Sequence, residues 1–139
     1  HGDLTPWNVV FRGRKVAGII DWDTARPMSR VWDLSYAAYQ FVPFHPVEDL
    51  PNWGWDQQPD IAGRLGMFLD AYGMDISRDE LVSTAAIRLL SIAQYIDSQV
   101  AAENPSFAIH AEERHSAGYR SAAQDLLRRL SAGDFAERS

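Results

Sequence analysis

Cysteine is absent from this chain of 139 residues, which excludes disulfides and thiolate metal sites and makes the cytoplasm the expected location. Long apolar runs are absent too, because no stretch approaches the roughly 20 apolar residues that a membrane-spanning helix needs. The sequence opens on His-Gly-Asp, without a basic and then apolar leader. We therefore expect neither a secretory signal nor a membrane partner.

Basic residues are in the minority. Lysine and arginine number 13 against 19 acidic residues, which gives a net charge of −6. A basic face is expected of nucleic-acid-binding proteins, so this balance argues against a nucleic-acid partner, whereas it would suit a cationic one. Lys15 is the only lysine. The length and the ordinary share of apolar residues predict one domain with one sizeable core.

Two short β-branched runs lie near the start of the chain. Residues 9–11 and 16–20, with Gly13 between them, predict a β-hairpin. A long ordered loop is expected at 43–59, where four prolines oppose helix formation. The predicted helices are 30–41 behind a Ser29 cap, 60–72 closed by Gly73, a long helix from a Ser77 cap to near Pro105, and 108–130. The fold class is therefore mostly α with a small β-hairpin, that is, α+β.

Three polar side chains occupy positions that the hairpin brings to one end. Asp3 lies in a turn before the first strand, Asn8 directly precedes that strand, and Asp21 follows the second. Because a hairpin returns its second strand beside the first, Asn8 and Asp21 can face each other, while Asp3 lies in the loop that feeds this end. Two oxygen ligands beside a further carboxylate suit Mg²⁺, with phosphate oxygens and waters completing the octahedron. Phosphoryl transfer needs such a set, since a metal must neutralise charge on the transferred group and a carboxylate must orient or deprotonate the attacking hydroxyl.

These residues belong to three ordered motifs. They read His1-Gly2-Asp3-x-x-Pro6-x-Asn8, then Ile20-Asp21-Trp22-Asp23, then Asp33-Leu34-Ser35. In this order and spacing the motifs resemble the aminoglycoside phosphotransferase family, which is choline/aminoglycoside kinase-like and similar to protein kinases. The resemblance implies a protein-kinase-like fold with a mostly helical C-terminal lobe. It also implies transfer of the γ-phosphate of ATP or GTP to a hydroxyl of an antibiotic or metabolite.

The same resemblance implies roles for single residues. Asp3 would be the catalytic aspartate, and Asn8 and Asp21 would bind Mg²⁺. Three further residues would support them: His1 packing under the loop and bonded to Asp33, Asp33 bracing the loop, and Asp23 either backing the metal ligands or merely solvated.

One part of such an enzyme is not encoded in these residues. Kinases of this kind cover the phosphates with an N-terminal lobe that carries a lysine on a strand. Lys15 lies in the hairpin turn, after the catalytic loop, and the sequence has no Gly-x-Gly-x-x-Gly run. We therefore expect the C-terminal lobe alone, with the nucleotide lobe absent and little or no activity by itself. Residues 1–28 would form the catalytic loop and metal-binding hairpin, and 29–139 a helical substrate subdomain.

The acceptor is the least specified partner. Trp7, Trp53 and Trp55 could line a pocket for a small hydroxylated, cationic molecule through cation–π contact, although core packing is the commoner fate of tryptophan. Two other functions stay open. The lobe could be a non-catalytic interaction module, with an exposed apolar patch at the hairpin and Trp22 that could also drive self-association. A metal-dependent phosphohydrolase is the weaker alternative, because the dense second ligand set of two-metal sites is missing.

Overall fold

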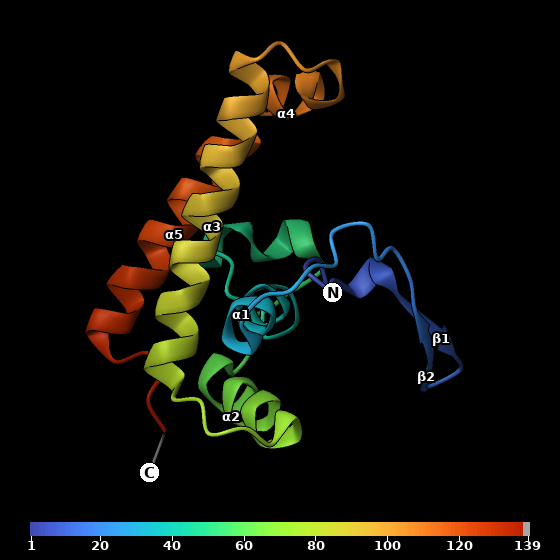
Figure 1. Ribbon diagram of the computed structural model, residues 1–139. Coiled ribbons are helices and arrows are strands. Elements are labelled where there is room, and N and C mark those ends of the chain that lie inside the picture. The colour runs from blue at the N-terminus through green and yellow to red at the C-terminus, as the bar shows by residue number, and fades with distance from the viewer. Residues whose placement is uncertain (138–139) are drawn as a thin grey trace.

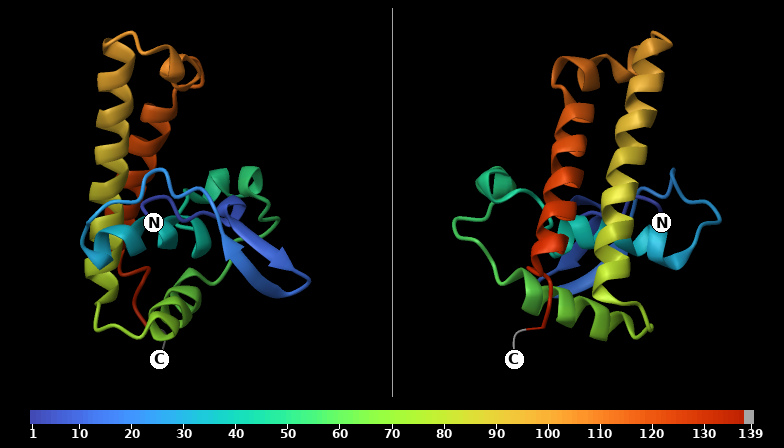
Figure 2. Two further views of the ribbon diagram at one scale, coloured as in Figure 1. Left: turned by 45° about the vertical axis from the view of Figure 1, so that its right-hand side comes forward. Right: turned by 90° about the vertical axis from the view of Figure 1, so that its left-hand side faces the viewer.

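The β-branched runs form the predicted hairpin. The computed structural model, which describes residues 1–137, pairs β1 (Val9–Arg12) with β2 (Lys15–Ile19) as antiparallel strands. Gly13 takes a φ of +60° in the two-residue turn, a conformation that glycine adopts without steric cost. Figure 1 and the left view of Figure 2 show the hairpin projecting away from the helices.

Helices account for most of the remaining chain, and their predicted caps are confirmed. Ser29 accepts a hydrogen bond from the Trp32 amide, and Ser77 accepts one from the Glu80 amide. Gly73 adopts a left-handed φ of +71° at the end of its helix. The helices are α1 (Arg30–Phe41), α2 (Ile61–Tyr72), α3 (Arg78–Ala101), α4 (Ala108–Glu112) and α5 (His115–Ala132).

Two of the predicted segments differ from the structure. The loop at 43–59 contains a 3₁₀ helix, η2 (Val47–Trp53), whose tighter turns accommodate Pro51 and which ends at Gly54 with φ +82°. The single helix predicted over 108–130 is two helices, because Arg114 takes a left-handed φ of +55° between α4 and α5. No glycine or proline marks this break, so the sequence carried no signal for it.

The helices enclose one core. Figure 2 shows α3 and α5 lying side by side in antiparallel directions, and α1 packs against α3. One face of α3 is buried at Val82, Ala86, Leu89, Ala93 and Ile96. No helix within residues 1–137 combines the length and apolar character that a membrane crossing requires. The N-terminal loop lies against α1 and α3, which is where the candidate site forms.

Candidate active site

The loop that carries Asp3 is held from two sides. Asp33, in the first turn of α1, accepts hydrogen bonds from the backbone nitrogens of His1 at 3.1 Å and Gly2 at 2.8 Å. The His1 ring bonds elsewhere: Nε2 lies 2.9 Å from the Ile20 carbonyl oxygen, and Nδ1 accepts from the Asp3 amide at 3.2 Å. Asp33 therefore does contact His1, but through the backbone and not through the imidazole. The loop is fixed between the end of β2 and the start of α1.

A third anchor, Arg88, was not predicted. This residue of α3 is 8% exposed, and its Nη2 donates to the Gly2 carbonyl oxygen at 2.8 Å. Its guanidinium also lies 5.0 Å from the centre of the Trp32 ring. The sequence did carry one sign of a buried role for Arg88. It is a charged residue on the apolar face of a long helix, next to Ala85 and Leu89, which are both buried.

Asp3 and Asn8 are in contact. The Asn8 Nδ2 donates to the Asp3 carbonyl oxygen at 3.0 Å and lies 3.4 Å from Asp3 Oδ2. The Asn8 carbonyl oxygen accepts from the Ile20 amide at 3.0 Å, so Asp21 follows directly after the last paired residue of the hairpin. Within residues 1–137 no hydrogen bond reaches Asn8 Oδ1, which leaves that oxygen free to accept one ligand.

The groups around Asp3 shift the pKa of its carboxyl. Burial raises the pKa of the Asp3 carboxyl above its usual value, and the negative charge of Asp21 raises it further. The positive charge of Arg88 and the hydrogen bond from Asn8 act in the opposite direction. Asp21 therefore lies within electrostatic reach of Asp3. Its own φ of +60° is a left-handed conformation that is uncommon outside glycine and that is often found at functional sites.

The two predicted metal ligands lie at the same end of the hairpin. In the described part of the chain Asn8 Oδ1 has no hydrogen-bond partner, and Asp21 follows Ile20, whose amide pairs with Asn8. Across residues 1–137 no three His, Cys, Asp or Glu side chains are grouped to hold an ion. A magnesium ion bound by this amide and carboxylate would thus take its other ligands from phosphate oxygens and water, as magnesium commonly does.

A cavity of about 670 Å³ lies next to Asp3. Its walls come from the N-terminal loop, from the segment after β2, and from α1, α3, α4 and α5. The residues that line it are Gly2, Asp3, Trp7, Asp23, Thr24, Arg26, Tyr36, Arg88, Ser91, Ile92, Tyr95, Ile96, Phe107, His110 and Tyr119. This volume is in the range of pockets that bind drug-sized ligands. The cavity brings Asp3 to a space large enough for an organic acceptor.

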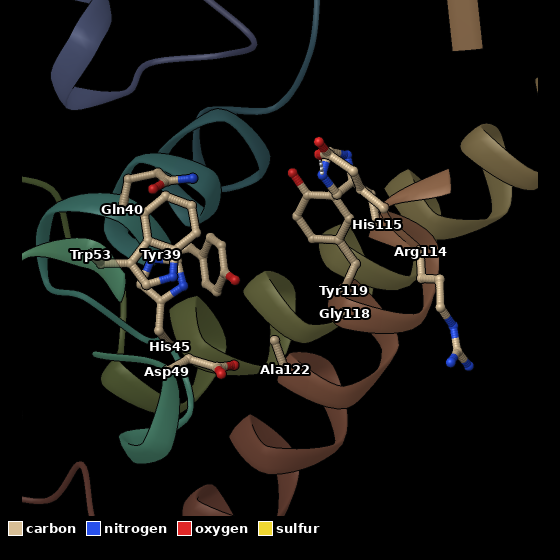
Figure 3. Close-up of a pocket in the computed structure, with 11 residues that line it drawn as sticks. Tyr39, Gln40, His45, Asp49, Trp53, Arg114, His115, Gly118, Tyr119 and Ala122 are labelled. Atoms are coloured by element: carbon tan, nitrogen blue, oxygen red, sulfur yellow. Dashed lines mark ion pairs between the residues drawn. The ribbon is translucent and has the colours of Figure 1, made fainter. Parts of the chain in front are cut away.

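A second, smaller cavity of about 260 Å³ shares Tyr119 with the first and does not reach Asp3 (Figure 3). Its aromatic wall is built on His45, whose ring lies 4.3 Å from Trp53 and 4.2 Å from Tyr39, measured between ring centres. Burial lowers the pKa of His45 to about 4, so the ring is neutral at physiological pH. The larger cavity is therefore the one positioned for chemistry.

The remaining predicted residues are dispersed. Trp7 and Asp23 line the larger cavity, whereas Trp53 lines the smaller one and stacks on Trp7 with 6.2 Å between ring centres. Trp55 lies against Arg64, whose guanidinium is 4.8 Å from the ring centre. Trp55 is not among the lining residues of either of these cavities in the described part of the chain. The three tryptophans thus do not form one pocket.

A buttressed loop with a partly buried aspartate, beside a hairpin that ends in an amide and a second aspartate, is an arrangement suited to phosphoryl transfer. Comparison with known families agrees. Residues 1–81, more than half of the chain, match the APH family, described as the phosphotransferase enzyme family. The chain belongs to this family.

The curated proteins include a partial relative. Over 74 residues the chain is 28% identical to the trifolitoxin immunity protein of Rhizobium leguminosarum bv. trifolii. The aligned region covers 53% of this chain and 28% of that protein, so the chain spans well under half the length of this relative. No solved structure matches the chain.

Proposed function

We propose that these residues form the acceptor-side lobe of a small-molecule kinase, which transfers the γ-phosphate of ATP or GTP to a hydroxyl. The observation that carries the proposal is the position of Asp3, which contacts Asn8, lies within electrostatic reach of Asp21 and lines the larger cavity. Family membership supports phosphotransfer in general. The hydroxyl acceptor, the nucleotide donor and Mg²⁺ are parts of the proposal.

In this proposal Asp3 orients the acceptor hydroxyl and accepts its proton. The acceptor oxygen bonds to the γ-phosphorus as the bond from that phosphorus to the bridging oxygen of the nucleoside diphosphate breaks, and the diphosphate takes the electron pair. Asn8 Oδ1 and the Asp21 carboxylate would hold Mg²⁺, which would neutralise charge on the phosphates. The raised pKa of Asp3 makes its carboxylate a better proton acceptor than an ordinary aspartate.

The nucleotide lobe is the second element of the proposal. Lys15 is the only lysine, and it begins β2 where the sequence had predicted the hairpin turn. It follows the catalytic loop in the chain, so it cannot be the strand lysine of an N-terminal nucleotide lobe. We expect transfer to require residues outside these 139. The chain should be assayed alone and, where its gene encodes residues before His1, as the longer product. Turnover by the 139-residue chain at rates typical of kinases would contradict this part.

The decisive test replaces Asp3 in whichever form shows transfer. Radiolabelled ATP or GTP with Mg²⁺ and a panel of hydroxylated acceptors would report product by chromatography. Asp3→Ala should lower the transfer rate by about 10²–10⁴-fold, since a positioned proton acceptor contributes this much. Asp70→Ala removes an exposed carboxylate on α2 and is the matched control, expected to retain activity. Activity of Asp3→Ala within a few-fold of the control would refute the role of Asp3.

The apolar hairpin favours a second candidate, an interaction module. The hairpin exposes 55% of Phe11, 61% of Val16 and 51% of Ile20, and Trp22 beside it is 55% exposed. An apolar surface of this kind marks a site of protein contact. It suits a docked nucleotide lobe and equally a non-catalytic partner. Analytical ultracentrifugation of the chain and of Phe11→Ser tests for self-association through this surface: a concentration-dependent mass that Phe11→Ser abolishes would support it.

A further inference from the structure

The charges around the larger cavity cancel. Among residues 1–137 the acidic residues that line it are Asp3 and Asp23, and they are matched by two arginines, Arg26 and Arg88. A molecule with several amines binds best where carboxylates outnumber basic groups, because each ammonium must exchange its water shell for a charged partner. Once Asp3 is committed to the acceptor hydroxyl, the arginines outnumber the one remaining carboxylate. The cavity therefore disfavours a polyamine.

The part of the cavity wall formed by α3 and by residues 107–110 is aromatic and aliphatic. Tyr95 and Phe107 meet edge to face with 5.6 Å between ring centres, and His110 follows at 5.2 Å from Phe107. Ile92 and Ile96 of α3 line the same cavity. Rings arranged in this way offer faces and edges to a further ring, and such aromatic contacts add to the gain from burying apolar surface.

Beside these charged groups, the cavity wall carries the neutral hydroxyls of Tyr36 and Tyr119. The Tyr36 and Tyr119 hydroxyl oxygens are 3.2 Å apart, and Gln40 Nε2 donates to Tyr36 at 3.3 Å. Burial raises the pKa of Tyr36 and of Tyr119, so both keep their protons at physiological pH. A hydroxyl can donate and accept, which matches the hydroxyl groups of a neutral ligand.

From this composition we infer that the acceptor is a neutral, hydroxylated molecule with an aromatic or apolar ring, which packs against Tyr95 and Phe107 and directs a hydroxyl toward Asp3. The assignment of that hydroxyl as the phosphorylated group rests on the proposed function, whereas the class of ligand rests on the cavity alone. This class of ligand differs from the cationic acceptor expected from the tryptophans, and the experiment below distinguishes the two.

Binding without nucleotide tests the class of ligand. Phenyl β-glucoside, methyl β-glucoside and kanamycin would be titrated into the chain by calorimetry, as a neutral ligand with an aromatic ring, its counterpart without the aromatic ring, and a polyamine. We expect phenyl β-glucoside to bind at least about tenfold more tightly than either of the others. Equal affinity for the two glucosides, or tighter binding of kanamycin, would overturn the inference.

Variants locate the binding and separate the two proposals. Tyr95→Ala and Phe107→Ala should each weaken phenyl β-glucoside binding about fivefold, whereas Tyr72→Ala, which removes an exposed tyrosine at the end of α2, should leave it unchanged. Unchanged binding by both cavity variants would refute the inference. Phosphorylation of kanamycin but not of neutral acceptors would refute it while leaving the proposed function intact. Binding that follows the variants without any transfer in the longer product would refute the proposed function alone.

Discussion

Replacing Arg88 by methionine tests whether α3 positions the loop that carries Asp3. Methionine keeps the unbranched apolar stem of the side chain but removes the guanidinium and its hydrogen bond from Nη2 to the Gly2 carbonyl oxygen at 2.8 Å. A hydrogen bond from a charged donor contributes about 1.5–3 kcal/mol. Part of this is recovered in the variant, because Arg88 Nε is buried without a partner within the described residues and its desolvation is unfavourable. We expect a net loss of about 1–2 kcal/mol of unfolding free energy.

Two measurements follow from this value. For a chain of this length about 1 kcal/mol corresponds to roughly 4 °C, so thermal unfolding of Arg88→Met should occur about 4–8 °C below the parent. Carbon-13 NMR of the Asp3 carboxyl should show its titration midpoint moving to higher pH, since the charge of Arg88 holds the Asp3 pKa down. Arg88→Lys retains the charge and should restore the midpoint more fully than the stability, because lysine lacks the planar donor fork.

The control is an arginine that touches no part of the loop. Arg120 on α5 is half-exposed and pairs with Asp97, and Arg120→Met should change stability by less than about 1 kcal/mol without moving the Asp3 titration. If Arg88→Met unfolds at the same temperature as Arg120→Met and leaves the Asp3 midpoint unchanged, α3 does not position the loop. The assignment of Arg88 would then be wrong.

Three further predictions concern buried or strained groups. Burial lowers the pKa of His45 from 6.5 to about 4, so the folded state favours the neutral ring. Urea unfolding should therefore show that up to about 3 kcal/mol of unfolding free energy, present above pH 6.5, is lost as the pH falls toward 4. His45→Phe should lack this loss, and an unchanged pH slope in that variant would contradict the prediction. Gly2→Ala should lower the free energy of unfolding by about 2 kcal/mol or more, because φ is +85° and a Cβ would lie 2.7 Å from the Thr24 carbonyl oxygen. Gly13→Ala, with φ +60° but open space around it, should lower it by only about 1 kcal/mol. Equal losses in thermal unfolding would refute the clash. The pKa of Asp3 is raised, so its contribution to stability is lost as the pH rises through that pKa. Asp3→Asn should therefore unfold at a higher temperature than the parent at pH 7, and the gain should be smaller at pH 3. A lower melting temperature of the variant at pH 7 would contradict this.

The features that the sequence predicted well are those with local causes. The hairpin follows from β-branched runs around Gly13, and the starts of α1 and α3 follow from serine caps whose hydrogen bonds are formed within three residues. The contact between Asp3 and Asn8 is similarly local, since five residues separate them. In each case the partner atoms are close in sequence, so spacing alone brings them together.

The features that the sequence did not predict depend on distant contacts. Arg88 reaches Gly2 across 86 positions, and the larger cavity gathers Tyr36, Tyr95 and Tyr119 from three different helices. In the sequence each of these tyrosines is an ordinary residue of an amphipathic helix. Only the packing of α1, α3 and α5 brings the three side chains to one cavity. The break at Arg114 belongs here as well, because a left-handed arginine has no local signature.

The loop and hairpin therefore cannot be a unit independent of the helices. A two-stranded hairpin alone is marginally stable in water, and this one leaves both strands mostly exposed. The conformation of its loop includes left-handed backbone at Gly2 and Asp21, which persists only where surrounding contacts enforce it. Those contacts come from Asp33 and Arg88, on α1 and α3. A peptide of residues 1–28 should accordingly show no hairpin in its NMR spectrum, and a folded hairpin in that peptide would show that the helices are not needed to shape the candidate active site.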